Sequence, residues 1–370
     1  MGEGWGEGSS ASARPASLTQ NPHPNPLPAY RERGPEEPAF GMTSAHTTLA
    51  QPPPRRLEKA PRVAERATSP RGPGWWKVRT RAAPYLFLLP YFLVTAVFFL
   101  YPLFYAAVLA FYQTNGPAYR AYVGLDNFRF ILRDPDFHTA LWNTTVFALC
   151  SIFIQLPLSL GLALLLNARQ GRLKGFFRLM IFSPNLVGPV FVAILFQMMF
   201  TPRYGLLNRG LYALFNWASA LEFRWTQDPD LVMPGLVIAA LWMYVGFNMI
   251  FFLAALQNVD QSLVEAARID GAGPVATFFN VTVPAIAPVA TFVVVTSTIG
   301  SFQLFELPYI LLQGFGPRNA GLTIVGYLYN YAFDSGDLGT GAAVGWLLTL
   351  IILGIALVQI RISRNVGSER

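Results

Sequence analysis

Six long windows of this chain contain no Asp, Glu, Lys or Arg. They cover residues 82–119, 137–168, 179–202, 231–259, 271–305 and 338–360. A helix needs about 20 apolar residues to cross the roughly 30 Å hydrocarbon core of a bilayer, and each window holds such a segment. The composition, 53% hydrophobic and 13% charged, also excludes an ordinary soluble domain, in which about 25% of residues are charged. We therefore predict an all-α membrane protein with six transmembrane helices.

The expected transmembrane helices lie within these windows, at 85–111, 140–166, 179–200, 232–256, 283–312 and 341–360. A further uncharged stretch, 319–333, is too short and too polar to cross, and we expect it to form an interfacial or surface helix. The first span runs for about 27 residues without a small-residue cleavage site, whereas the core of a signal peptide has about 7–15 residues. We interpret it as a membrane anchor.

The distribution of positive charge predicts the orientation, because the cytoplasmic segments of membrane proteins carry an excess of Lys and Arg. With the N-terminus inside, 20 of the 27 Lys and Arg residues lie on the cytoplasmic side. They occupy the N-terminal segment, the loops near 167–178 and 257–282, and the C-terminal end. We therefore predict that both termini are cytoplasmic (N-in and C-in).

The first 80 residues differ in composition from the rest of the chain. They are rich in Pro, Gly, Ser, Arg and Glu and show no apolar periodicity, so they cannot bury a core. We predict a disordered, basic cytoplasmic tail over 1–80 and a membrane domain over 81–370. An alternative is that the beginning of the tail is sequence upstream of the true translation start, for which Met42 is available.

Sequence signatures of catalysis and cofactor binding are missing. The chain has no G-x-x-x-x-G-K-[ST] loop for ATP phosphates and no H-E-x-x-H zinc motif, and its three His and one Cys form no cluster. Residues 271–276 match a dinucleotide-binding pattern by letter, but no strand is expected before them. The net charge of +7 is spread over segments that flank the spans. We predict no enzymatic activity, no cofactor or metal in this chain, and no nucleic-acid partner.

The loop at 257–284 carries the strongest local signals. Asp260 or Ser262 can cap a short helix, Gly271 can end it, and Pro274 can open a second helix at its first position. The two helices are expected to expose Ala and Ile from the first and Phe278 and Phe279 from the second. A compact apolar projection of this kind suits a groove in another protein.

This loop resembles the EAA loop of permease subunits of binding-protein-dependent ABC importers, in which EAA is followed by three residues, Gly, nine residues and I-x-L-P. The matching residues are Glu265, Ala266, Ala267, Gly271, Val281, Val283 and Pro284, with Val in place of both Ile and Leu. The resemblance implies that the loop docks into a cytoplasmic ATPase subunit, where Glu265 pairs with a cation and Gly271 permits the turn. Pro284 is expected to mark the start of the fifth span. The expected ATPase-coupling residues are Glu265, Ala266, Ala267, Asp270, Gly271 and Pro284.

Other segments resemble the maltose and glycerol-phosphate type of sugar permease within that family. They are 123–128, 143–145, 205–208, 305–306, 314–317 and 337–343, so the resemblance covers about 85–365. Two positions depart from the pattern, since Phe315 replaces a usual Gly and Glu306 replaces an Asp often seen there. The resemblance implies the MetI-like ABC importer permease fold in a bacterial or archaeal inner membrane.

The resemblance also implies an assembly and a transport function. A permease of this type forms half of the translocation pathway for a sugar, an oligosaccharide or a related polyol, and glycerol phosphate is also possible. The implied partners are a second homologous permease, an ATPase dimer that holds ATP and Mg, and an extracytoplasmic solute-binding protein.

Polar side chains inside the spans are candidates for the substrate pathway, because they are costly in hydrocarbon and usually face a protein interior or a water-filled cavity. Asn248 lies in the fourth span, and Gln303 and Glu306, three residues apart, are expected on one face of the fifth. Aromatic residues beside them that could stack on a sugar are Tyr244, Phe247 and Phe302. Interhelical hydrogen bonding by the amides and plain packing of the aromatic rings are the alternatives.

An ion-coupled secondary transporter is the competing function, and a membrane enzyme is a third. Secondary transporters usually contain inverted repeats around an ion site. The two halves of this chain show no such similarity, and Glu306 would be a single coupling carboxylate. These features favour the importer permease.

Overall fold

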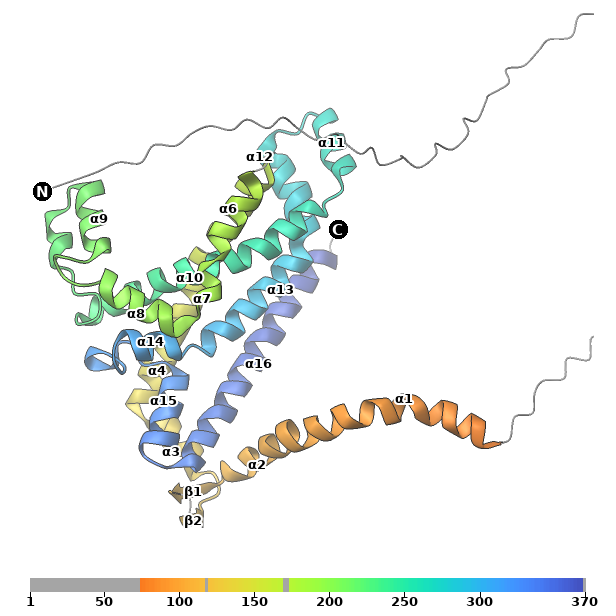
Figure 1. Cartoon of the computed structure of the whole chain (residues 1–370), viewed down its shortest axis with the longest axis vertical. Coiled ribbons are helices and arrows are strands. Elements are labelled where there is room, and N and C mark those ends of the chain that lie inside the picture. The colour runs from red at the N-terminus through yellow and green to blue at the C-terminus, as the bar shows by residue number, and fades with distance from the viewer. Residues whose placement is uncertain (1–73, 117–118, 169–172, 369–370) are drawn as a thin grey trace, which may run out of the picture. The chain divides into compact units, whose positions relative to one another are not determined.

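The computed structural model describes residues 74–116, 119–168 and 173–368. Helices make up most of this part of the chain (Figure 1). The predicted tail 1–80 and the alternative start Met42 lie outside the described residues, except that helix α1 (Gly74–Thr95) includes the end of that tail.

Five helices in the described ranges are apolar and long enough to cross a membrane. They run over Tyr85–Leu109, Pro135–Ala168, Pro229–Gln257, Pro274–Phe302 and Leu338–Ser363. Their segments are α1, η1 (Ala96–Leu100) and α2 (Tyr101–Leu109); α4 (Pro135–Cys150), η2 (Ser151–Gln155) and α5 (Leu156–Ala168); α10 (Pro229–Gln257); α12 (Pro274–Thr277), η4 (Phe278–Thr282) and α13 (Val283–Phe302); and α16 (Leu338–Ser368). They correspond to five of the six predicted spans.

The third predicted span is not one continuous helix. Residues 179–200 are divided among α6 (Leu173–Phe182), α7 (Pro184–Val187) and the apolar α8 (Pro189–Met199). A proline begins both α7 and α8 and cannot donate the N–H bond that would continue the preceding helix. Gly188, between α7 and α8, has a φ of +84°, which an L side chain rarely adopts. The prediction of a single helix is wrong here because hydropathy does not register such breaks.

The fifth predicted span, 283–312, also differs from the structure at both ends. Helix α13 stops at Phe302, and α14 (Glu306–Leu311) is a separate helix. Pro284 does not mark the start of the span, because one helix runs from Pro274 through to Phe302. The second helix of the predicted loop is therefore the beginning of a spanning helix and not an independent short one.

In three of the spanning helices a proline follows closely on a π-helical turn, whereas Pro234 inside α10 and Pro288 inside α13 have no such turn directly before them. Pro102, Pro157 and Pro284 each lie two residues beyond the end of such a turn, η1, η2 and η4 respectively. A proline ring clashes with the carbonyl group four residues earlier. That carbonyl lies in the middle of the wider π turn in all three cases. The π turn therefore allows the helix to continue across the proline.

The segments between the long helices fold into short elements. They are α3 (Asp126–Arg133), α9 (Leu206–Phe215), η3 (Ala218–Glu222), η5 (Pro317–Asn319), α15 (Ile324–Tyr329) and η6 (Asn330–Asp334). The stretch 319–333, predicted as an interfacial or surface helix, contains α15, but Ile324 and Tyr327 are buried against α4 and α16. Strands β1 (Tyr112–Asn115) and β2 (Tyr119–Tyr122) form an antiparallel hairpin that the all-α prediction did not include.

The hairpin is tied to the beginning of α16 by one carboxylate. Asp337 Oδ1 accepts hydrogen bonds from the backbone N–H of Thr114 at 3.1 Å and from its hydroxyl at 3.2 Å. Asp337 Oδ2 accepts a third from the hydroxyl of Thr340 at 2.7 Å. The two bonds from Thr114 to Asp337 join residues that are 223 positions apart in the sequence.

Three buried asparagines fix the other connecting segments. Asn127, Asn143 and Asn208 each direct the side-chain amide at backbone carbonyl oxygens of another segment. The carbonyl groups belong to Ala110 and Tyr112 for Asn127, to Asn319 and Leu322 for Asn143, and to Phe223 for Asn208. Each asparagine belongs to a segment that resembles the sugar permeases, so these motif residues hold loops in place.

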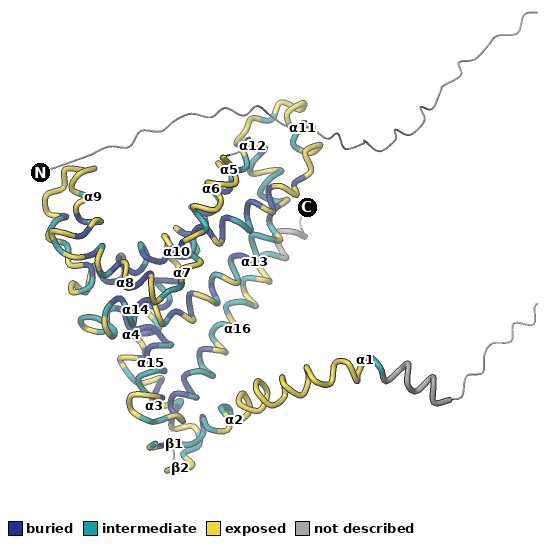
Figure 2. The backbone as a smooth tube through the Cα atoms, viewed as in Figure 1, coloured by how far each residue is buried: buried dark blue, intermediate teal, exposed yellow. Residues whose placement is uncertain are grey.

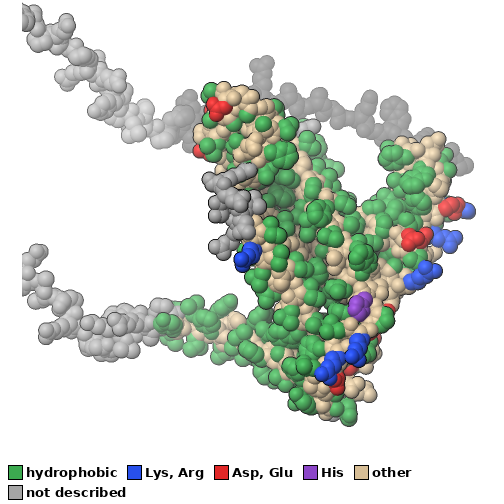
Figure 3. Space-filling view, turned by 180° about the vertical axis from the view of Figure 1, so that it is seen from behind, with side chains coloured by type: hydrophobic (Ala, Val, Ile, Leu, Met, Phe, Trp, Pro, Cys, Tyr) green, Lys and Arg blue, Asp and Glu red, His purple; other side chains and the backbone are tan. Residues whose placement is uncertain are grey.

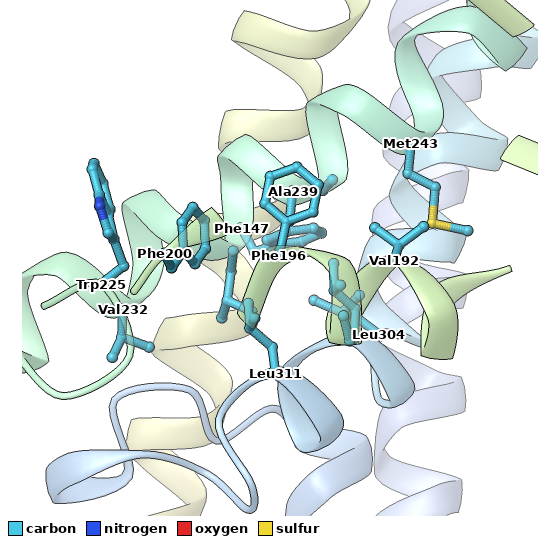
Figure 4. Packing of buried hydrophobic residues seen from close by; sticks show 14 residues of the cluster. Phe147, Val192, Phe196, Phe200, Trp225, Val232, Ala239, Met243, Leu304 and Leu311 are labelled. Carbon is cyan, nitrogen blue, oxygen red and sulfur yellow. The ribbon is translucent and has the colours of Figure 1, made fainter. Parts of the chain in front are cut away.

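The degree of burial differs strongly between the spanning helices (Figure 2). In the most apolar part of α10, 56% of the residues are buried, whereas none is buried in Tyr85–Leu109. Helix α10 packs with α8 and α14 around Phe196, Leu304 and Leu311, which Figure 4 shows. Hydrophobic side chains also cover much of the surface that Figure 3 shows. Exposed apolar surface of this extent requires lipid or other subunits around it.

Helices α13 and α16 lie antiparallel. The Gln359 amide donates to the hydroxyl of Thr298 at 2.8 Å, and Ser363, further along α16, pairs with the earlier Thr291. The C-terminal end of α16 therefore lies beside the beginning of α13, on the same side as the loop at 257–284. This agrees with the prediction that the C-terminus and the loop share the cytoplasmic side.

We expect Asn143→Ala to destabilise the fold, because the carbonyl groups of Asn319 and Leu322 would lose a buried donor. A buried group left without its hydrogen bond costs about 1–3 kcal/mol. Thermal unfolding in detergent measures the effect. Thr145→Val is the control, since the Thr145 hydroxyl bonds only to Leu141 of its own helix. Equal melting temperatures for the two variants would contradict the assigned role of Asn143.

Candidate functional site

The loop between α10 and α13 has the local structure predicted for it. Helix α11 (Gln261–Ile269) begins at the cap residue Asp260, whose carboxylate accepts a hydrogen bond from the backbone N–H of Ser262 at 2.9 Å. Hydrogen bonds from the backbone and then the side chain of Ser262 hold the pKa of Asp260 below its ordinary value. Helix α12 begins at Pro274, as expected.

Gly271 turns the chain sharply after α11. Its φ is +82°, in the left-handed region. The N–H of Gly271 donates to the carbonyl of Arg268 at 3.1 Å, and the N–H of Ala272 donates to the carbonyl of Ala267 at 2.9 Å. This pair of bonds is the Schellman motif, which ends a helix by satisfying its last carbonyl groups. The predicted turn at Gly271 is confirmed, and its cause is the backbone conformation.

The loop exposes both apolar and acidic side chains. The exposed apolar side chains are Leu263, Ile269, Val275 and Phe279, and Ile269 is 86% exposed. Glu265 and Asp270 are also exposed, and neither makes an ion pair or side-chain hydrogen bond with a described residue. Of the other expected coupling residues, Ala266 is exposed, whereas Ala267 and Pro284 are half-buried. We call the surface formed by Leu263, Glu265, Ile269, Asp270, Val275 and Phe279 the coupling surface.

A cavity of about 180 Å³ lies between three of the spanning helices. This volume is well above the roughly 10–15 Å³ that one water molecule requires. It is lined from α4 and η2 by Phe147, Ser151 and Gln155, from α10 by Tyr244, Phe247 and Asn248, and from α13 and its end by Thr296, Ser297, Gly300, Ser301 and Leu304.

The structure brings together half of the predicted substrate-pathway residues. Tyr244, Phe247 and Asn248 line the cavity. Phe302 does not, because it is 3% exposed and packs in a hydrophobic cluster with Ile324 and Tyr327.

Gln303 and Glu306 do not share a helical face, contrary to the prediction. Helix α13 ends at Phe302, Gln303 follows it with a φ of −95° and a ψ of 7°, and Glu306 is the first residue of α14. Both side chains are exposed.

Several polar residues of the cavity were not predicted from the sequence. Ser151 and Gln155 are buried in η2, and the Ser151 hydroxyl donates to Oε1 of Gln155 at 3.2 Å. An amide in the middle of an uncharged, apolar window is itself a signal, since polar groups in spanning helices usually face a protein interior. The rule that selected Asn248 would also have selected Gln155.

Comparison with known proteins agrees with this arrangement. Residues 155–367 match the model of the family described as binding-protein-dependent transport system inner membrane component. The chain belongs to this family. It is therefore a multi-pass membrane protein and a transport component, and the predicted identity as an ABC importer permease of the maltose and glycerol-phosphate type is confirmed.

Relatives of this binding-protein-dependent inner membrane component cover most of its length. The arabinooligosaccharides transport system permease protein AraP of Bacillus subtilis is 35% identical over 289 residues, which is 78% of this chain and 91% of AraP. The lactose transport system permease protein LacF of Rhizobium radiobacter is 36% identical, over 76% of this chain and 94% of LacF. The sn-glycerol-3-phosphate transport system permease protein UgpA of Yersinia pestis is 35% identical, over 75% of this chain and 92% of UgpA.

A solved structure confirms the MetI-like permease fold. A chain of a bacterial ABC transporter involved in the import of the acidic polysaccharide alginate aligns with a TM-score of 0.68 at 24% identity. The alignment covers 79% of this chain and 99% of that chain.

We expect Phe302→Ala and Phe247→Ala to act differently, although both residues were predicted to contact substrate. Phe302 is 3% exposed and Phe247 is 41% exposed. Truncating a buried Phe costs about 3–5 kcal/mol, so Phe302→Ala should lower the melting temperature in detergent strongly. Phe247→Ala should leave it close to wild type. The opposite order would show that Phe302 is not part of the core.

Proposed function

We propose that this chain forms half of the membrane pathway of an ATP-driven importer for a sugar or a related polyol, with ATP hydrolysed on separate subunits. The observation that carries the proposal is the coupling surface, where apolar side chains of a rigid turn project from the side predicted to be cytoplasmic. Such exposed apolar residues, mixed with unpaired carboxylates, suit docking to another protein.

The geometry explains how motion of the loop would reach the cavity. The helix that starts at Pro274 continues without a break to Phe302 and carries Thr296, Ser297 and Ser301 of the cavity wall. At about 1.5 Å per residue, the cavity residues lie roughly 35 Å along this helix from the loop. At its other end the loop follows directly on α10, which supplies Tyr244, Phe247 and Asn248. A displacement of the loop therefore moves two walls of the cavity together.

The proposed importer also needs partner proteins that bind ATP and the external ligand. No phosphate-binding loop occurs in the sequence, so ATP and Mg would be bound by a dimer of ATPase subunits and not by this chain. The family description, binding-protein-dependent transport, supports an extracytoplasmic solute-binding protein. The unburied helix Tyr85–Leu109 and the three-helix cavity wall leave room for a second, homologous permease.

The names of the relatives support a carbohydrate substrate. They are permease proteins for arabinooligosaccharides, lactose and sn-glycerol-3-phosphate. Rings such as Phe147, Tyr244 and Phe247, next to amide and hydroxyl groups, suit a ligand with apolar faces and many hydroxyl groups.

We expect Gly271→Val to abolish or strongly weaken association with the ATPase while leaving the protein in the membrane. A left-handed conformation costs an L-residue roughly 1–2 kcal/mol, and a β-branched side chain is especially unsuited to it. None of the spanning helices is altered. The measurements are co-purification of the ATPase subunits and substrate-stimulated ATP hydrolysis in reconstituted vesicles.

Gly271→Asn is the matched control, because Asn tolerates the left-handed conformation at the end of a helix. It should retain most of the association. Glu265→Ala should act in the same direction as Gly271→Val but more mildly, through loss of one charge-assisted hydrogen bond worth about 1.5–3 kcal/mol. Wild-type behaviour of both Gly271→Val and Glu265→Ala would show that the loop is an ordinary connector.

A further inference from the structure

We infer that the cavity takes an uncharged sugar unit and not a phosphorylated or carboxylated one, and that Gln155 and Asn248 bind its hydroxyl groups. This inference rests on the proposed transport function and names the class of substrate within it. It distinguishes a neutral from an anionic substrate, because the names of the relatives include both neutral saccharides and sn-glycerol-3-phosphate.

The described wall of the cavity carries no charged side chain. None of the described residues that line it is Asp, Glu, Lys, Arg or His. Burying an anion without a cationic partner or a set of hydrogen-bond donors is very costly. Phosphate and carboxylate sites in proteins meet this cost with Arg or Lys, or with the free N–H groups at the start of a helix. The walls of this cavity are the middle and distal parts of helices, where the backbone N–H groups are already bonded within the helix.

Two amide side chains in the cavity wall have donors or acceptors that no described residue uses. Asn248 is 5% exposed and lines the cavity, and no described residue forms a hydrogen bond with its side chain. Gln155 is 4% exposed and accepts a bond from Ser151 through Oε1, which leaves its Nε2 donors for a ligand. Neither amide is among the described side chains that have a fully buried polar atom without a partner, so their unbonded atoms open onto the cavity. There they are accessible to a guest that supplies both donors and acceptors. Sugar hydroxyl groups do both.

The position of Gln155 depends on the π-helical turn η2. Gln155 is its last residue, two positions before Pro157. A π turn adds a residue to the helical turn and so rotates the following side chains relative to those before it. π turns are frequent at functional sites for this reason. Here the turn brings Ser151 and Gln155 together at the cavity wall opposite α10 and α13.

The test uses cells of the native organism with the gene for this chain deleted or restored, so that the complete transporter is present. The medium contains lactose, arabinotriose and maltotriose as neutral probes, and sn-glycerol 3-phosphate and an alginate trisaccharide as anionic probes. Mass spectrometry of the medium measures the uptake of each that depends on the chain. We expect this uptake to be confined to neutral probes.

Variants then test the two amides. Gln155→Leu and Asn248→Leu should each lower chain-dependent uptake at least tenfold at equal amounts of protein in the membrane. Thr349→Val is the control, because Thr349 lies on α16 away from the cavity and its hydroxyl is bonded to Gly345 of its own helix at 2.8 Å. It should change uptake less than twofold.

Chain-dependent uptake of an anionic probe, or of none of the neutral probes, would overturn the inference. Wild-type uptake by both Leu variants would overturn the role of the amides. Failure of the proposed function itself is distinguished by the co-purification experiment, since a chain that binds no ATPase is not an importer subunit whatever its cavity accepts.

Discussion

A bilayer offers the peptide backbone no hydrogen-bond partner, and the architecture of this chain follows from how that constraint is met. At Pro102, Pro157 and Pro284, π-helical turns allow the spanning helices to continue across the proline. Where a helix does stop, side chains supply the missing donors. The hydroxyl of Thr323 donates to the carbonyl of Leu304, between α13 and α14, at 2.7 Å. The amide of Gln197 donates to the carbonyl groups of Ile310 and Leu311 at the end of α14.

The same constraint places polar groups where they are useful. A helix can tolerate Ser151, Gln155 and Asn248 at membrane depth only if they face protein or a water-filled space. The helix over Pro274–Phe302 is continuous and connects that space to the coupling surface. Asp337 and the buried asparagines hold the connecting segments in place through hydrogen bonds.

Prediction from the sequence succeeded where local rules decide the structure. Uncharged windows located the five long helices, and the preferences of cap residues, glycine and proline located Asp260, Gly271 and Pro274 correctly. It failed where the outcome depends on distant contacts. A hydropathy average does not reveal the helix breaks at Gly188 and after Phe302. Nor does it show that Phe302 packs on α15 while Phe247 faces a cavity. The π turns were not predicted, although the prolines that follow them are visible in the sequence.

The coupling surface matters even in a cell where the transporter is not transporting. Ile269 ends α11, and Val275 and Phe279 lie on the helix that begins at Pro274. Local hydrogen bonds fix the turn between these two helices, and all three side chains are exposed in the chain by itself. A permease made in excess of its proposed partners therefore exposes this apolar surface to chaperones and proteases, which recognise exposed apolar segments. Under the proposed docking, the exposed apolar residues of this loop would therefore affect the lifetime of a chain without partners as well as the strength of docking.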